Sequence, residues 1–177
     1  TEYLEAFPNN VDSLRYFLTL RMPETKDSEF TWRDFQAAHN NELANDIGNF
    51  AQRVLVLLHK YNEGRVPDSS ACSTLQDELN KAKEAMEEAY ENYRFRDALQ
   101  AIMRVARYGN KFLGDAEPWK TMKTDKEAAL IALYDAVQIL GNLAYWMQPI
   151  LPFKSNELLS LLNLTKNRSW QEVGKAD

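Results

Sequence analysis

Polar side chains of the kind that read nucleic-acid bases recur along one segment with helical periodicity. Four of them lie at intervals of four residues: Asn41, Asn45, Asn49 and Arg53. That spacing places them along one ridge of an α-helix. Asparagine is a poor helix former, so three in register lower helix stability without an evident structural return. Amide and guanidinium groups pair with base edges through two hydrogen bonds, so the ridge is suited to base recognition, although a polar ridge packed against a neighbouring loop is the more common arrangement.

A tryptophan outside any apolar stripe is the second candidate. Trp119 follows Pro118 in the segment 114–120, which interrupts the helical pattern. An indole in such a break can plug the end of a helical bundle, or it can serve as a stacking platform for an unstacked base. The sequence leaves both interpretations open at this point.

Charge is unevenly distributed along the chain. Residues 94–126 hold eight basic residues against four acidic ones, whereas residues 76–91 hold six acidic residues against two basic ones. Such a division can create a phosphate-binding side, although solvated helix faces would give the same count. The overall net charge of −5 opposes general nucleic-acid binding.

Catalytic chemistry finds little support. His39 and His59 lie 20 residues apart on one expected helix, or roughly 30 Å at 1.5 Å per residue, so they do not share a site. The Glu-x-x-His pairs of bundle di-metal centres and the glycine-rich phosphate loops are absent from the sequence. Cys72 has no histidine near it in the sequence. We therefore expect no catalytic residue and no metal ligand in this chain.

Composition places the chain among helical globular proteins. Its 177 residues are 45% hydrophobic and suit one domain with a short appendage. Six glycines and six prolines are few for an all-β fold. A single cysteine excludes an internal disulfide framework and is typical of a reducing, cytoplasmic setting. The sequence has no uncharged apolar run of about 18 residues, so we expect no contact with a membrane.

Apolar periodicity predicts helices almost throughout. The expected helices span 11–21, 32–61, 73–93, 95–114, 125–148 and 154–163, with loops at 23–30 and 64–70. Thr31 and Thr124 are the expected N-caps of the second and fifth helices. The buried stripes are expected to include Leu18 in the helix at 11–21, Tyr93 in the helix at 73–93 and Leu161 in the helix at 154–163.

Two features predict how these helices pack. Gly109 falls on the apolar stripe of its helix, where the missing side chain would let another helix approach closely. The helix at 125–148 is apolar over most of its circumference, as expected of the central helix of a bundle. Short connections between successive helices make an antiparallel, up-and-down, all-α bundle the predicted fold.

Several motifs resemble one family in the order in which they occur. They are Asp12-Ser-Leu-Arg-Tyr16, the segment 23–35, Asn41-Glu-Leu-Ala-Asn-Asp-Ile-Gly-Asn-Phe-Ala-Gln-Arg53, Ala116-Glu-Pro-Trp-Lys120 and Gln148-Pro-Ile-Leu-Pro152. Together they resemble the C-terminal region of methionyl-tRNA synthetase, a class I aminoacyl-tRNA synthetase. The resemblance covers about residues 3–163.

The resemblance implies a tRNA-binding role. It implies that Asn49, Arg53 and Trp119 recognise the methionine anticodon CAU, with Trp119 stacked on the first base, a cytosine, and the other two bonded to that base's edge. Asn45 and Asn110 lie beside these positions and are further expected tRNA contacts. The partner is then tRNA(Met).

The resemblance also implies a division of the chain and of the parent enzyme. Residues 1–30 would end the stem-contact segment and its linker, 31–163 would form the anticodon-binding bundle, and 164–177 would be a C-terminal tail. The family's two ATP-binding signatures and its zinc-knuckle cysteines do not occur here. The chain starts at Thr1, so we expect a fragment without adenylate-forming activity. The catalytic domain, using ATP, Mg²⁺ and structural Zn²⁺, would precede it.

Two alternatives remain at this stage. The chain could be the anticodon-binding domain of a sister class I synthetase, which a core-buried Trp119 would favour. It could also be a helical protein-interaction module without nucleic acid. Phosphate contacts make tRNA affinity fall with salt, whereas binding in a protein-interaction module would not depend on salt in this way.

Overall fold

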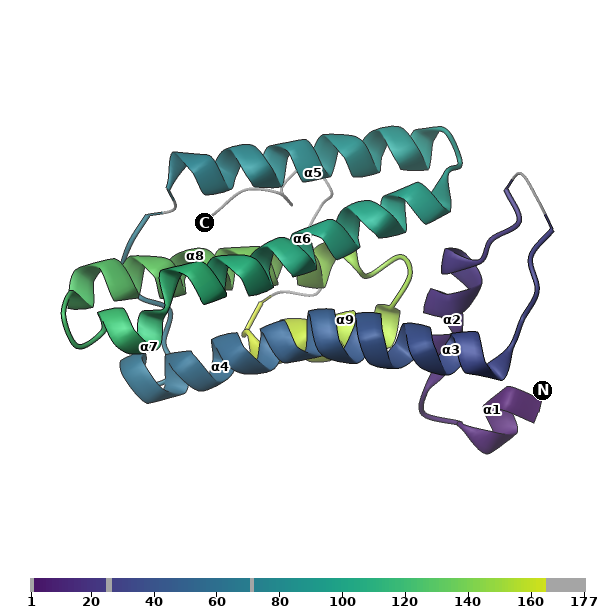
Figure 1. The fold of residues 1–177 in the computed structure, drawn as a ribbon, viewed down its shortest axis with the longest axis horizontal. Coiled ribbons are helices and arrows are strands. Elements are labelled where there is room, and N and C mark those ends of the chain that lie inside the picture. The colour runs from purple at the N-terminus through teal and green to yellow at the C-terminus, as the bar shows by residue number, and fades with distance from the viewer. Residues whose placement is uncertain (1, 25–26, 71, 165–177) are drawn as a thin grey trace.

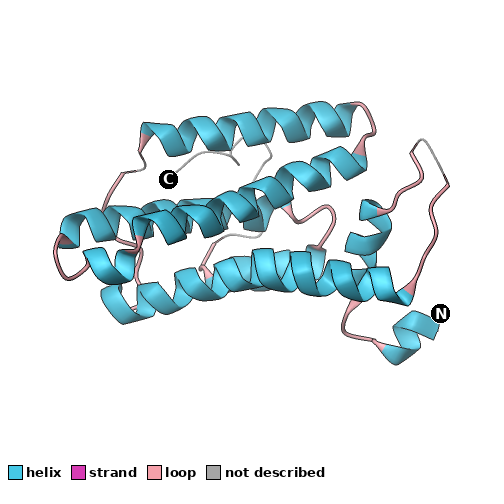
Figure 2. Cartoon of the chain, in the orientation of Figure 1, coloured by secondary structure: helices cyan, strands magenta, loops and turns pink. Residues whose placement is uncertain are grey.

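A computed structural model describes residues 2–24, 27–70 and 72–164, and every regular element within them is helical (Figures 1 and 2). The elements are α1 (Glu2–Ala6), α2 (Val11–Leu20), α3 (Trp32–Ala38), η1 (His39–Gly48), α4 (Asn49–Asn62), α5 (Ser73–Glu91), α6 (Phe95–Ala116), α7 (Pro118–Thr121), α8 (Lys126–Trp146) and α9 (Pro152–Leu161). The all-α prediction is confirmed. Residues 165–177, most of the expected tail, lie outside the described residues.

Helix α8 is the centre of the bundle, as its all-round apolar sequence predicts. It packs against α4, α6, α7 and α9 and touches α5. By length and composition alone it could cross a membrane, but 78% of its most apolar 18-residue window is buried inside the protein. Its apolar surface is therefore covered by neighbouring helices (Figure 1).

The long helix expected at 32–61 is a continuous rod made of three parts: α3, η1 and α4 (Figure 1). The middle part, η1, is a π-helix, and at its end the Asn49 N–H bonds to the Ala44 carbonyl five residues back. The backbone of this part departs from the α-helical geometry that the expected ridge assumed, and Asn41, Asn45 and Asn49 are nevertheless all exposed.

Gly109 makes the contact that its position in the sequence predicts. A Cβ atom added there would lie 2.5 Å from Cζ of Phe50, whose ring is fully buried. No real side chain tolerates that distance, so only glycine lets α4 and α6 approach so closely at this point.

Helix α2 buries Tyr16 and Phe17 in the core and is also tied to the rest of the bundle by polar side chains. The buried Asp12 carboxylate accepts a hydrogen bond of 2.6 Å from the Lys154 N–H in the first turn of α9. The Arg15 guanidinium donates bonds of 2.8 Å to the carbonyls of Pro149 and Ile150. Leu18, expected in the stripe, is instead 52% exposed. The first residues of the Asp12–Tyr16 motif thus fasten the turn between α8 and α9.

Helix ends are where the sequence-based boundaries need correction. The Thr31 side chain caps α3 as expected, but Asp125 rather than Thr124 caps α8, by accepting from the Ala128 N–H. Tyr93 lies beyond the end of α5 with a left-handed backbone and is exposed. Leu161, in the last turn of α9, is also exposed. A side chain at a helix terminus has no neighbouring helix opposite it, so periodicity overestimates its burial.

One carboxyl group is buried on the central helix. Asp135 of α8 is 2% exposed and accepts a long hydrogen bond of 3.4 Å from the Cys72 N–H at the start of α5. Burial raises the pKa of this carboxyl above its ordinary value. The bond connects α8 to a helix that otherwise packs mainly on α6.

We predict that Gly109→Ala destabilises the bundle by about 1–3 kcal/mol, because the new methyl group collides with the buried Phe50 ring. Gly114→Ala, on the same helix, is the matched control, since nothing lies within 4 Å of its added Cβ. It should be neutral or stabilise by up to about 1 kcal/mol, the helix-propensity difference. Urea unfolding followed by far-ultraviolet circular dichroism measures both. Equal losses in the two variants would contradict the close-approach argument.

We predict that Asp135→Asn changes how stability depends on pH. A raised pKa in the folded state means that this carboxyl favours folding when protonated, and that this contribution is lost as pH rises through the folded pKa. The amide keeps the acceptor for the Cys72 N–H but does not ionise. The free energy of unfolding of the variant minus that of the natural chain should therefore be larger at about pH 7 than at about pH 4. A stability difference that is independent of pH in urea titrations would contradict this prediction.

Candidate nucleic-acid interface

Four of the five residues that the resemblance implies as tRNA contacts meet in one cluster. Asn49 and Arg53 lie in the first turns of α4, Asn110 on α6, and Trp119 on α7. The Asn110 Oδ1 accepts hydrogen bonds of 3.4 Å from Asn49 Nδ2 and from Arg53 Nη1. The Arg53 guanidinium carbon lies 5.6 Å from the centre of the Trp119 ring. Residues separated by as many as 70 positions along the chain, Asn49 to Trp119, thus form one surface. We call these four residues the Asn–Arg–Trp cluster.

Trp119 is partly buried and partly accessible. Its ring packs against the edge of the hydrophobic core, and it retains intermediate exposure. Its buried part packs on the core, as expected of a residue that plugs the end of the bundle. Its ring also lies beside the Arg53 guanidinium in a cation–π contact and keeps some exposure, as expected of a stacking platform.

A reversal of the chain between α6 and α7 places Trp119. Glu117 has a left-handed backbone with φ of 41°, and the buried Pro118 then begins α7. The fixed φ of proline suits the first position of a helix, where its missing N–H costs nothing. The turn is closed by a bond from the Lys120 N–H to the Glu117 carbonyl. This short helix was not expected, because the sequence suggested only a break.

The carboxylates near the cluster are already paired with another arginine. Arg107 bonds to Asp46 at 2.9 Å and lies 3.7 Å from Glu42. Glu42 also accepts a bond of 2.6 Å from the Tyr16 hydroxyl. Burial, followed by this hydrogen bond to Glu42, raises the pKa of Tyr16 well above its ordinary value. These two carboxylates are thus ion-paired with Arg107 rather than with Arg53.

Arg53 differs from Arg107 in its partners. Among the residues that the structure describes, no carboxylate forms an ion pair with Arg53, and its polar contact is with the neutral amide of Asn110. Its side chain has intermediate exposure. A guanidinium has five N–H donors and no acceptor. Several donors therefore remain for a ligand that brings acceptor atoms.

The basic stretch at 94–126 is less positive than its count suggests. Four of its eight cations form ion pairs within the described residues. Arg94 pairs with Glu88 and Asp97, and Arg96 pairs with Glu24. Arg107 pairs with Asp46 and Glu42, and Lys120 pairs with Glu117. Four exposed cations form no ion pair in that same set: Arg104, Lys111, Lys123 and Lys126. The expected basic half-face is thus reduced to a few separate cations.

Asn45, the fifth expected residue, lies in η1 and is exposed. The hydrogen bonds of Asn110 go to Asn49, Arg53 and the backbone, and not to Asn45. Asn45 lies four residues before Asn49, which is exposed as well, but the hydrogen bonds within the cluster do not include it.

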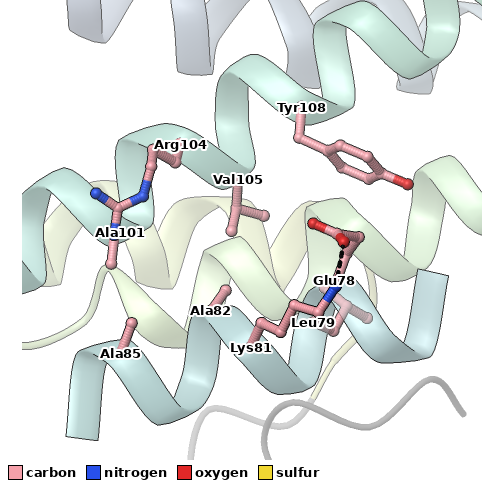
Figure 3. Close-up of a pocket in the computed structure, with 9 residues that line it drawn as sticks. All are labelled: Glu78, Leu79, Lys81, Ala82, Ala85, Ala101, Arg104, Val105 and Tyr108. Atoms are coloured by element: carbon pink, nitrogen blue, oxygen red, sulfur yellow. Dashed lines mark hydrogen bonds and ion pairs between the residues drawn. The ribbon is translucent and has the colours of Figure 1, made fainter. Parts of the chain in front are cut away.

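Other concave surfaces lie elsewhere. Figure 3 shows a groove of about 280 Å³ between α5 and α6, with a floor of small residues such as Ala82 and Ala101 and with Arg104 at its rim. A second cavity of about 340 Å³ lies between η1, α2 and α9, where Ser13 and His39 are hydrogen-bonded at 2.9 Å. In the described part of the chain no group of three or more His, Cys, Asp or Glu side chains could hold a metal ion. Neither concavity includes a member of the Asn–Arg–Trp cluster.

Comparison with known proteins gives one consistent result. The family model for the anticodon binding domain of methionyl tRNA ligase matches residues 64–177, and a model for class I tRNA synthetases (M) matches residues 1–55. A methionine–tRNA ligase of Porphyromonas gingivalis is 46% identical over 180 residues, which cover 99% of this chain and 26% of that protein. One of Flavobacterium psychrophilum is 47% identical over 176 residues, covering 97% of this chain and 26% of that protein.

Solved structures agree. Mycobacterium tuberculosis methionyl-tRNA synthetase in complex with methionyl-adenylate superimposes with a TM-score of 0.85 at 27% identity, covering 98% of this chain and 35% of that chain. Its apo form gives a TM-score of 0.87 at 28% identity, covering 98% and 36%. The chain thus spans about a quarter of the length of the curated relatives that it matches.

These matches name the methionine enzyme rather than a sister synthetase. The anticodon-binding model begins after Asn49 and Arg53, which lie in the part that the class I synthetase model matches, whereas the solved structures cover the whole helical bundle. The chain belongs to the family of anticodon-binding domains of methionyl-tRNA ligases.

Proposed function

We propose that this chain recognises the CAU anticodon of tRNA(Met) through Asn49, Arg53 and Trp119, as the anticodon-reading part of a methionine–tRNA ligase. The observation that carries the proposal is the state of Arg53. It is a partly buried guanidinium with no carboxylate partner among the described residues, and it lies over the ring of a partly exposed tryptophan. A cation in such a place suits a ligand that brings both acceptor atoms and a flat ring.

An unpaired anticodon base has both properties. Its ring stacks on the indole, and its edge offers acceptors to the donors of Arg53. The amide of Asn49 both donates and accepts, so it suits an edge that presents a donor beside an acceptor, as cytosine does. Trp119 then stacks on the first anticodon base, while Asn49 and Arg53 bond to its edge.

Phosphate contacts would come from exposed cations near the cluster. Lys111 directly follows Asn110 on α6, and Lys123 lies two residues beyond the end of α7. Both are exposed and form no ion pair within the described residues. Phosphate contacts give affinity that falls with salt but carry no sequence information. We propose that Asn45, exposed on η1, contributes at most to this positioning of the backbone.

The rest of the ligase reaction belongs to other parts of the parent protein. We propose that residues 1–30 lead from the catalytic domain and that residues 31–163 form the anticodon-binding bundle. That catalytic domain would use ATP and Mg²⁺, with Zn²⁺ as a structural metal, in the cytoplasm. The side chains described here do not fit those groups, since they offer neither a phosphate loop nor a cluster of metal ligands. The contribution of this chain is to bind and orient the anticodon.

We predict that Trp119→Ala and Arg53→Ala, placed in the intact ligase, each lower kcat/KM for tRNA(Met) by about ten- to a hundredfold. A stacked base or a paired base contact is worth about 1–3 kcal/mol. Methionine activation should be unchanged, because it takes place on another domain. Arg104→Ala is the matched control. Arg104 is an exposed arginine in the groove between α5 and α6, away from the cluster.

The comparison of anticodons decides the role of Arg53. A lost base contact narrows the gap in affinity between CAU and variant anticodons, whereas a lost phosphate contact weakens all tRNAs alike. Filter binding with the two tRNAs measures this gap. If Arg53→Ala weakens both tRNAs equally, Arg53 positions the backbone and its assignment as a base reader is wrong.

We also predict that the 177-residue chain by itself shows no ATP–pyrophosphate exchange with methionine, because none of its described residues forms a nucleotide site. The intact ligase, assayed beside it, is the positive control. Exchange by the purified chain above the background of a mock preparation would overturn the proposed division of labour.

A further inference from the structure

We infer that Asn110 is a positioning residue that holds Asn49 and Arg53 ready for the anticodon and does not itself read a base. The inference rests on the proposed function and deepens it. Asn110 was an expected tRNA contact because of its place in the sequence, and the geometry around it indicates a different role.

The hydrogen-bonding capacity of the Asn110 side chain is fully used within the protein. A side-chain amide has two N–H donors on nitrogen and two lone pairs on oxygen. The nitrogen donates to the carbonyls of Asp46, at 2.7 Å, and Ala106, at 3.2 Å. The oxygen accepts from Asn49 and Arg53. Nothing remains on this amide to pair with a base edge unless an existing bond breaks.

The four hydrogen bonds of the Asn110 amide differ in length. The difference distinguishes the bonds that fix Asn110 itself from the bonds by which it orients Asn49 and Arg53. The bond to the Asp46 carbonyl is of ordinary length, whereas the two bonds from Asn49 and Arg53 are 3.4 Å long and therefore weak. The amide nitrogen fixes the side chain to the backbone of η1 and of its own helix. The amide oxygen orients the two readers while leaving them easy to release to a base.

The neighbouring glycine explains how so short a side chain spans two helices. Gly109, the residue before Asn110, is where α6 approaches Phe50 of α4 closely. The close approach brings the backbone of η1 within reach of the Asn110 amide. The π segment sets which carbonyl is presented, because Asp46 lies within it.

By holding Asn49 and Arg53 in place, the Asn110 amide reduces the conformational free energy that binding costs. Free arginine and asparagine side chains sample many rotamers, and fixing them upon binding costs free energy. An acceptor that already directs both side chains removes part of that cost. Asn110 would therefore affect anticodon affinity through Asn49 and Arg53, and its effect should disappear when both are absent.

The test is a mutant cycle in the intact ligase, measured as filter binding of tRNA(Met) and of a variant with an altered anticodon. Asn110→Ala should weaken binding of the CAU tRNA by about three- to thirtyfold, within the usual range for coupled residues, and should narrow the CAU preference. In the Asn49→Ala/Arg53→Ala background, adding Asn110→Ala should change binding less than about twofold. The effects of mutations at independent sites add, whereas a residue that acts only through two others has no further effect once those two are removed.

Two controls separate positioning from general damage. Asn80→Ala removes an exposed helical asparagine on α5, far from the cluster in the sequence, and should leave both affinities unchanged. Urea unfolding of Asn110→Ala gives the fraction folded under the binding conditions. If that variant is folded but weakens both tRNAs equally, Asn110 affects RNA binding without acting through the residues that read the base, and the inference is overturned.

The remaining outcomes distinguish the inference from the proposed function. If the Asn49→Ala/Arg53→Ala variant loses the CAU preference and Asn110→Ala costs a further tenfold or so in that background, Asn110 contacts the RNA directly. In that case the inference is wrong and the proposed function stands. If the double variant keeps the full CAU preference, the two residues are not the readers, and the proposed function and the inference fail together.

Discussion

The close approach of α4 and α6 at Gly109 is the constraint on which the rest of the site depends. The Phe50 ring occupies the space that any larger residue at position 109 would fill, and so the two helices lie near enough for Asn110 to reach the η1 backbone. The same short distance brings Asn49 and Arg53 onto the Asn110 oxygen. A wider separation would leave a buried Phe50 without its neighbour and two polar side chains, Asn49 and Arg53, without their common acceptor. Packing inside the bundle and the arrangement of its polar surface thus have one origin.

Two departures from regular backbone geometry then direct the side chains. The π segment η1 precedes Asn49 and Arg53 in the long rod, and these two side chains contact Asn110 of α6, whereas Asn45 lies exposed within η1. The left-handed Glu117 reverses the chain after α6 and begins α7, which places Trp119 beside Arg53. Irregular backbone of this kind is often found at functional sites, where it re-aims side chains that a regular helix would direct elsewhere. Both departures lie at the edges of the rigid helices α4 and α6, which hold them in place.

Pairing of charges inside the protein decides which cation is available. Arg107 takes up the carboxylates of Asp46 and Glu42, and the Tyr16 hydroxyl bonds to Glu42 as well. Neither carboxylate forms an ion pair with Arg53, whose contacts are with the neutral Asn110 amide and the Trp119 ring. The acidic overall balance of the chain is therefore compatible with a nucleic-acid role, because the local partners of one arginine matter more than the net charge. The polar motif of α2 has a structural role elsewhere in the bundle, because Asp12 and Arg15 hydrogen-bond to the turn that leads into α9.

The sequence alone determined much of this molecule. Apolar periodicity gave the helices of the all-α bundle, the composition of α8 gave its central place, and the stripe position of Gly109 gave the close approach, because each depends on local pattern and burial. Motif resemblance also singled out Asn49, Arg53 and Trp119. Only the tertiary structure decided that Asn110 joins these three in one set of contacts, and that half of the basic residues at 94–126 are ion-paired with carboxylates. The reason is that hydrogen bonds and ion pairs between distant helices depend on which segments pack together, and the spacing of residues within one segment does not specify this.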